Sequence, residues 1–173
     1  FGEEKIKDRA RVILTTAINR LASSTASELT TTSVEIENDE VKGKIIGKEG
    51  RNIRTFERVA GVELIIDDSP HEIVISCFDP IRRQVARVAL ENLIKDGRIQ
   101  PAKIEEFVEK AQNEVHEIVK KKGEEAMYEC GIMNTDPRLI AILGRLHFRT
   151  SYGQNVLKHS IEVAHLCEMI ASE

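Results

Sequence analysis

Residues 43–54 read Gly43-Lys44-Ile45-Ile46-Gly47-Lys48-Glu49-Gly50-Arg51-Asn52-Ile53-Arg54. The four residues from Gly47 to Gly50 have a glycine at each end and a charged pair between them. Glycines let a backbone bend sharply and approach a sugar-phosphate chain with no Cβ in the way. An apolar turn precedes the loop and a helical pattern opening with Arg51 follows it, and N–H-rich helix ends beside such a bend favour anions. The segment therefore predicts an anion-binding loop between two helices.

The charge of the chain is locally concentrated around this loop. The 173 residues carry a net charge of -4 and have a pI near 5.8, so the chain as a whole is not a polycation. Between residues 42 and 58, however, six basic residues face two acidic ones, a local balance of +4; the basic residues are Lys42, Lys44, Lys48, Arg51, Arg54 and Arg58. A nucleic-acid site on this protein would then be a basic patch on an acidic body.

The periodicity around the loop predicts an α+β domain. Alternation predicts strands over 32–37, 62–66 and 73–77, the last two as an antiparallel hairpin around a turn at 67–70. Caps and apolar spacing predict helices from Asn38-Asp39 to Ile46, from Arg51 to Gly61, and from Asp79-Pro80 to Gly97. One three-stranded antiparallel sheet backed by three helices satisfies this order.

This order, together with the string from Ile45 to Ile53, resembles a type I KH domain over residues 31–96. The resemblance implies single-stranded RNA or DNA held in a cleft between the first two helices and the sheet edge, with phosphates at the G-x-x-G loop. The residues that it implies as RNA-binding are Lys44, Ile45, Ile46, Gly47, Lys48, Glu49, Gly50, Arg51 and Arg54. Ile45 and Ile46 are the expected apolar floor for bases, although one of them must face the core.

Glu49 departs from a purely basic loop, since its carboxylate leaves the loop formally neutral. A screened pair near 4 Å in water is worth about 1 kcal/mol, so one acid can offset Lys48. Weak binding by this module is therefore expected. Three alternatives stay open: a connector without a ligand, Ile45 and Ile46 as simple core residues, and Arg54 and Arg58 as solvated helix charges.

The segments on either side predict further helices. Residues 3–22 have one apolar stripe, typical of a helix packed on the neighbouring domain or of the end of a dimerising coiled coil. Pro101 opens a long helix expected to end at Gly123, with a strand-like piece over 126–132. Further helices are expected from Asp136-Pro137 to about Leu146 and from about Gln154 onward. The expected units are 1–28, the KH domain 29–97, a helix and linker 98–133, and 134–173.

The last segment resembles the first helix of HD-type metallophosphohydrolases in its residues 155–166, Asn-Val-Leu-Lys-His-Ser-Ile-Glu-Val-Ala-His-Leu. That family implies His159 as a metal ligand, the other ligands being a His-Asp doublet and a later aspartate. His165 is about 240° further around the helix and cannot face the same ion. No His-Asp doublet occurs in the 173 residues, so this piece is expected to bind no metal and not to cleave RNA.

A KH domain, a long helix and an HD start together resemble the bacterial ribonuclease Y family, through strings that span nearly the whole chain. They lie at residues 45–54, 78–83, 95–105 and 149–164. The resemblance implies a membrane-anchored endoribonuclease on the cytoplasmic side that starts mRNA decay, with a divalent-metal HD domain cutting single-stranded RNA. It also implies homodimerisation and partners among RNA-decay enzymes.

Two other functions remain open from the sequence. The KH fold could serve as a protein-interaction or dimerisation surface, or the chain could be a fragment of an HD nucleotide phosphohydrolase. Cys77, Cys130 and Cys167 are odd in number and widely spaced, which favours reduced thiols in a cytosolic setting. No signal peptide or membrane span is evident. The start at Phe1 and the stop inside an apolar-periodic segment are interpreted as those of an excised fragment.

Overall fold

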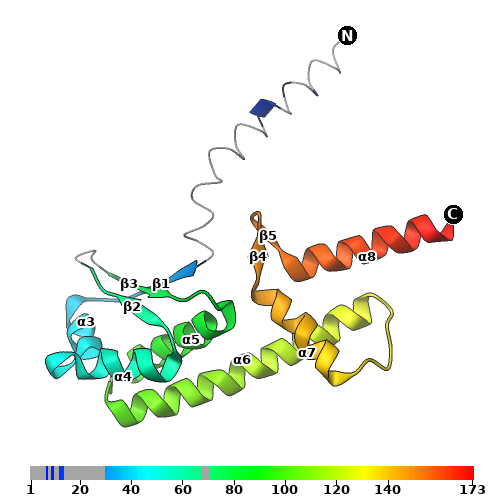
Figure 1. Cartoon of the computed structure of the whole chain (residues 1–173). Helices are drawn as coiled ribbons and strands as arrows, with labels where there is room; N and C mark the ends of the chain where they lie inside the picture. The colour runs from blue at the N-terminus through cyan, green and yellow to red at the C-terminus, as the bar shows by residue number, and fades with distance from the viewer. Residues whose placement is uncertain (1–6, 8, 10–11, 14–29, 68–70) are drawn as a thin grey trace.

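The computed structural model describes residues 7, 9, 12–13, 30–67 and 71–173 (Figure 1). Most of the helix expected over 3–22, and residues 68–70 of the expected turn, lie outside the described residues. The helices are α3 (Asp39–Ile46), α4 (Arg51–Ala60), α5 (Pro80–Asp96), α6 (Pro101–Glu129), α7 (Pro137–Arg145) and α8 (Val156–Ser172). The strands are β1 (Thr31–Glu35), β2 (Glu63–Ile65), β3 (Glu72–Ser76), β4 (Thr150–Ser151) and β5 (Gln154–Asn155). Two 3₁₀ turns are η1 (Lys48–Gly50) and η2 (Leu146–Phe148).

The first three strands form one antiparallel sheet in the order β1-β3-β2. Alternate side chains face the helices, so Val34, Leu64, Ile73 and Ile75 are buried. With α3, α4 and α5 packed on one face, this confirms the predicted α+β class and the type I KH order. β2 forms an edge of the sheet beside α4, which is where the predicted cleft requires an edge.

The helix caps that the sequence predicts are formed. Asn38 Oδ1 accepts a hydrogen bond from Val41 N at 3.1 Å, and Asp79 Oδ1 accepts one from Ile81 N at 2.8 Å. Gly61 and Gly97 end α4 and α5 in the left-handed conformation. Local sequence thus sets where these helices begin and end, and thereby where the G-x-x-G loop lies.

The long helix α6 shares the core of the KH domain. Its Ile104, Val108, Ala111 and Val115 belong to the same buried cluster as Phe56 of α4 and the apolar face of α5. In Figure 1 the helix passes under α4 and α5 and continues to α7. At 1.5 Å per residue its 29 residues span roughly 43 Å, so it extends from the KH core to the C-terminal elements.

The prediction that α6 ends at Gly123, followed by a strand over 126–132, is wrong, because the helix continues to Glu129. Gly123 is buried where α6 crosses α7. A Cβ on Gly123 would lie 2.0 Å from Ile140 O, and one on Gly144 would lie 1.8 Å from Val119 O. The two glycines permit close backbone contact between helices, and that tertiary role cannot be distinguished from a terminator by sequence alone.

The last helix, α8, is packed much more loosely than the others. Of the α8 residues only Leu157 is buried, and the helix points away from the rest of the molecule (Figure 1). Its exposed apolar residues include Val163, Leu166, Met169 and Ile170. No helix in the described part of the chain is both long and apolar enough to cross a membrane.

Candidate nucleic-acid interface

The G-x-x-G loop is a tight bend in the left-handed region of backbone space. Gly47 has φ 71° and ψ 176°, and Gly50 has φ 71° and ψ 22°. Glu49 also has a positive φ of 56°, which is uncommon for a residue with a side chain. Gly47 has a second constraint, since a Cβ there would lie 2.6 Å from Asn52 Nδ2. Only glycine therefore fits at position 47, and the bend is held in one shape.

Asn52 fastens this bend, a role that the sequence analysis did not assign. Its Nδ2 donates to Lys44 O at 2.9 Å and to Ile99 O at 3.0 Å. These bonds join the end of α3 to the segment before α6, so the loop is braced from outside. The sequence shows a polar residue two positions after the second glycine. It does not show the partner of that residue, because Ile99 is 47 residues away.

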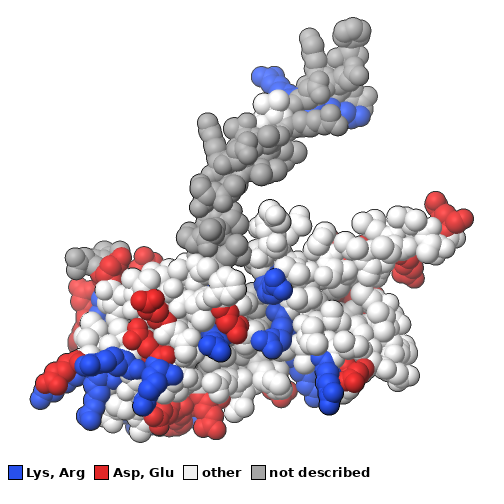
Figure 2. Space-filling view, viewed as in Figure 1, with Lys and Arg blue, Asp and Glu red and all other residues white. Residues whose placement is uncertain are grey.

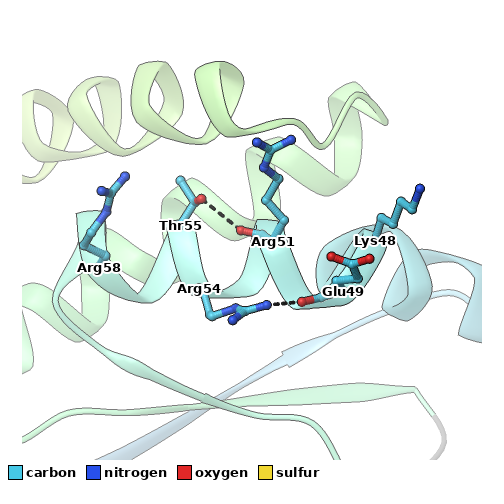
Figure 3. Close-up of a pocket in the computed structure, with 6 residues that line it drawn as sticks. All are labelled: Lys48, Glu49, Arg51, Arg54, Thr55 and Arg58. Carbon is cyan, nitrogen blue, oxygen red and sulfur yellow. Dashed lines mark hydrogen bonds between the residues drawn. The ribbon is translucent and has the colours of Figure 1, made fainter.

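Arg54 is directed at its own loop. Its Nε donates to Gly50 O at 3.2 Å. Its Nη2 donates to Glu49 O, and Figure 3 draws this second bond. The guanidinium satisfies carbonyl oxygens at the bend and brings positive charge to it. Arg54 therefore both shapes the loop and adds to its field.

The loop opens into a groove of about 640 Å³ along α4, lined by Lys48, Glu49, Arg51, Arg54, Thr55 and Arg58. We refer to it as the α4 groove. In Figure 3 Arg51, Thr55 and Arg58 project from one side of α4, because steps of four and three residues return to the same helix face. Thr55 and Arg58 were not among the predicted binding residues, although that spacing is readable from the sequence.

The groove is positively charged and its key cations are available. Among the described residues, Lys48 and Arg51 form no ion pair, whereas Arg58 Nη2 lies 3.7 Å from Glu105 Oε1. That pair is exposed and contributes little. No side chain caps the N-terminus of α4 and its first turn carries no acid, so the helix end favours an anion.

Two lysines of the basic cluster have other roles. Lys42 is buried, and its Nζ donates to Asp67 O at 3.1 Å, which joins α3 to the segment after β2. Lys44 Nζ pairs with Glu40 at 2.8 Å, and this hydrogen bond lowers the pKa of the Glu40 carboxyl. Lys42 therefore supports the fold, whereas the Lys44 pair is exposed and contributes little, so Lys44 remains a predicted RNA contact.

One of Ile45 and Ile46 is expected to face the core, and the structure shows that it is Ile45; Ile46 remains the predicted apolar floor. Ile45 is 2% exposed and lies in the core, whereas Ile46 at the end of α3 is 37% exposed. Ile65 on the edge strand β2 is 43% exposed and was not predicted. Neighbouring side chains of a strand point to opposite faces of the sheet, so Ile65 points away from the face that buries Leu64. This alternation can be read from the sequence.

His159 lies in the first turn of α8 and is exposed. Within the described residues, no three His, Cys, Asp or Glu side chains are grouped so as to hold a metal ion. One imidazole does not make a hydrolytic centre, because such a site needs several ligands.

Comparison with known proteins matches one segment of the chain to a domain family and nearly the whole chain to longer proteins. Residues 31–92 match the KH domain family. Ribonuclease Y of Thermoanaerobacter pseudethanolicus is 60% identical over 172 residues, covering 99% of this chain and 34% of that protein. Ribonuclease Y of Alkaliphilus metalliredigens is 57% identical over 175 residues, covering 99% of this chain and 37% of that protein.

Among solved structures, a crystal structure of a protein of unknown function from Aeropyrum pernix covers 57% of this chain and 53% of its own at 21% identity. Its TM-score of 0.36 is too low to bear on the fold. The chain spans about a third of the length of the curated relatives that it matches. By fold and by sequence, residues 31–92 are a KH domain, within a chain that resembles one part of bacterial ribonuclease Y throughout its length.

Proposed function

We propose that this chain binds single-stranded RNA through the G-x-x-G loop and the α4 groove, as the KH module of an endoribonuclease. The observation that carries the proposal is the braced glycine bend beside an uncapped helix N-terminus, with Lys48 and Arg51 exposed next to it. Phosphates would contact backbone N–H groups and these two cations. KH domains hold about four nucleotides of backbone in this way.

The test is fluorescence anisotropy of a labelled single-stranded RNA of about 12 nucleotides at about 50 and about 200 mM salt. Binding should weaken with a log-log slope of about 0.7 per neutralised phosphate. The double variant Lys48→Asp, Glu49→Asp should bind roughly 10- to 30-fold more weakly, since one attraction of about 1 kcal/mol becomes a repulsion. Lys121→Asp on the exposed surface of α6 makes the same change in net charge away from the groove and serves as control.

Unchanged binding by the loop variant would remove the loop from the RNA site. An absence of binding even at low salt would instead favour the KH fold as a protein-interaction surface. The variant Glu49→Gln should have the opposite effect. Removing the carboxylate should tighten RNA binding by about 5-fold.

We propose further that RNA hydrolysis in the whole protein is carried out by a metal-dependent HD domain. The support is the resemblance of residues 155–166 and the identity to ribonuclease Y proteins. His159 would supply one ligand, and the others would come from residues outside this chain. The chain by itself should leave labelled RNA intact in the presence of Mg²⁺ or Mn²⁺, and cleavage that survives purification would contradict this division of labour.

The same resemblance supports three broader parts of the proposal: homodimerisation, association with other RNA-decay enzymes, and attachment of the whole protein to the cytoplasmic side of the membrane. Sedimentation of the chain with and without residues 1–28 tests the first of these. A monomer in both cases would place dimerisation elsewhere in the whole protein.

A further inference from the structure

A second large pocket, of about 850 Å³, lies where the KH domain meets the C-terminal elements. Its residues come from the β3–α5 connection on one side and from α7, η2 and β4 on the other. They include Phe78, Asp79, Arg83, Arg145, Arg149 and Ser151. We refer to it as the Phe78 pocket. Neither the KH clamp nor the HD resemblance accounts for it.

Phe78 is the most unusual residue of this pocket, since its side chain is 90% exposed. Its backbone is nevertheless held on both sides: Cys77 N donates to Thr30 O at 2.9 Å, and Asp79 caps α5. An aromatic ring presented from a fixed connection is suited to stacking on a nucleobase, which is sequence-tolerant because every base has a π-face.

Of the three arginines that line the pocket, one supports the fold and two are exposed to solvent. Arg83 is buried and donates to Thr32 Oγ1 at 3.1 Å and to Cys77 O at 2.5 Å, so it holds the floor. Arg145 and Arg149 are exposed and form no ion pair within the described part of the chain. Asp79 is the one acidic lining residue, and it already caps α5 and lies 3.9 Å from Arg82. The pocket therefore favours an anionic partner.

No residue lines both the α4 groove and the Phe78 pocket, but a short series of contacts at the end of α4 leads from one to the other. The groove ends at Arg58, three residues before Gly61, and the side chain of Arg82 lies over Gly61. Arg82 in turn pairs with Asp79, which lines the Phe78 pocket. Figure 2 shows Lys and Arg side chains on one face of the molecule, over the α3–α4 end and again where α7 approaches β4, with Asp and Glu side chains between the two groups. The ten residues of α4 separate the loop from this junction by about 15 Å.

We propose that the Phe78 pocket is a second subsite for single-stranded nucleic acid, for a strand that leaves the α4 groove past Gly61. One base stacks on Phe78, and the phosphates beside it contact Arg145 and Arg149. This inference rests on the proposed function, because the strand is first held by the KH loop. It adds that the C-terminal elements take part in binding RNA beyond the four nucleotides of the KH clamp.

The experiment compares single-stranded RNAs of about 4 and about 12 nucleotides on the intact chain. Phe78→Ala should weaken binding of the longer strand by about 5-fold or more and leave the short strand unaffected. Tyr128→Ala, which removes another exposed aromatic ring at the end of α6, is the matched control and should change neither. The double variant Arg145→Gln, Arg149→Gln should lower the salt slope for the longer strand by about 1.4.

The failures of the two proposals are distinguishable. If the loop variant Lys48→Asp, Glu49→Asp weakens binding but Phe78→Ala and the arginine variant do not, the KH clamp stands and the second subsite is overturned. If the wild-type chain binds neither strand, the proposed function fails first. If the short strand binds too weakly to measure, the salt slope of the longer strand with the arginine variant decides whether the second subsite exists. A Phe78→Ala effect on self-association without one on RNA binding would assign the pocket to a protein contact and overturn the subsite.

Discussion

The KH domain and the α7–α8 region differ sharply in how their apolar residues are used. In the KH domain the inward residues of sheet and helices are nearly all covered, and Ile73, Ile75, Ala86, Ala89 and Leu93 are 0% exposed. In α8 the apolar face is open, with Leu166 54% and Ile170 76% exposed. Both regions nevertheless contain helices with the same 3.6-residue apolar period and with formed N-caps.

The difference shows that amphipathic periodicity and stability are separate properties. A periodic pattern states which face of a helix is apolar, and a cap states where the helix begins. Most helical stability in proteins comes from packing of the apolar face rather than from propensity. The KH elements have partners for that packing within the described residues, whereas α8 has few.

The largest effect that would test this contrast comes from truncating one apolar side chain in each region. Phe56→Ala removes a fully buried ring and should lower the free energy of unfolding by about 3–5 kcal/mol. Leu166→Ala on the open face of α8 should change it by no more than about 0.5 kcal/mol. Urea unfolding followed by circular dichroism measures both, and a large cost at Leu166 would mean that α8 is packed in solution.

The glycine crossing of α6 and α7 tests whether the two regions are rigidly joined. Gly144→Ala should cost about 1–3 kcal/mol, because its Cβ would overlap Val119 O and force the helices apart. Gly43→Ala in α3 is the control, since nothing lies within 4 Å of that Cβ. It should instead stabilise by about 0.5–1 kcal/mol through helix propensity. Stabilisation by both changes would refute the close crossing.

Two asparagines fasten the two regions and should have separable effects. Asn52→Ala removes the bonds to Lys44 O and Ile99 O and should cost about 1–2 kcal/mol while weakening RNA binding. Asn155→Ala removes the N-cap of α8 and its bond to His147 O, at a cost of about 1 kcal/mol with the KH clamp intact. Anisotropy with the short RNA distinguishes them, and an equal loss of binding would contradict a local role for Asn52.

The smallest expected effect is a pH dependence of the free energy of unfolding that arises from His147, in the C-terminal region. Burial, with a smaller contribution from Lys122, lowers the pKa of His147. Above a pH of about 6.5 this histidine is neutral in both states. As the pH falls below that value, the unfolded chain binds a proton that the folded chain resists, so the free energy of unfolding decreases until the pH passes the lowered pKa.

The corresponding variant is His147→Gln, which has no titrating ring and should unfold with a flatter pH dependence between about pH 7.5 and about pH 5. Urea midpoints at the two pH values provide the measurement. Parallel curves for wild type and variant would show that another group titrates in this window.

Much of the fold is readable locally, and the errors share one cause. The cap at Asn38, the Asp-Pro starts of α5 and α7, and the glycine ends of α4 and α5 are all where the sequence analysis expects them. The strands differ from their predicted bounds by one or two residues. Gly123 is predicted to end α6 but lies inside it. A glycine that ends a helix and a glycine that permits close helix packing cannot be distinguished in one sequence.

The amino-acid sequence by itself determined the order of the KH elements, their capped ends and the tight bend at Gly47–Gly50, because backbone preferences and caps act over only a few residues. The tertiary structure alone decided which cations and apolar residues are exposed and which are buried. It buried Ile45 and Lys42, braced the bend through Asn52, and brought Phe78 beside Arg145 and Arg149. Those outcomes depend on contacts between residues far apart along the chain, such as Lys42 with Asp67 and Asn52 with Ile99, and no local pattern specifies them.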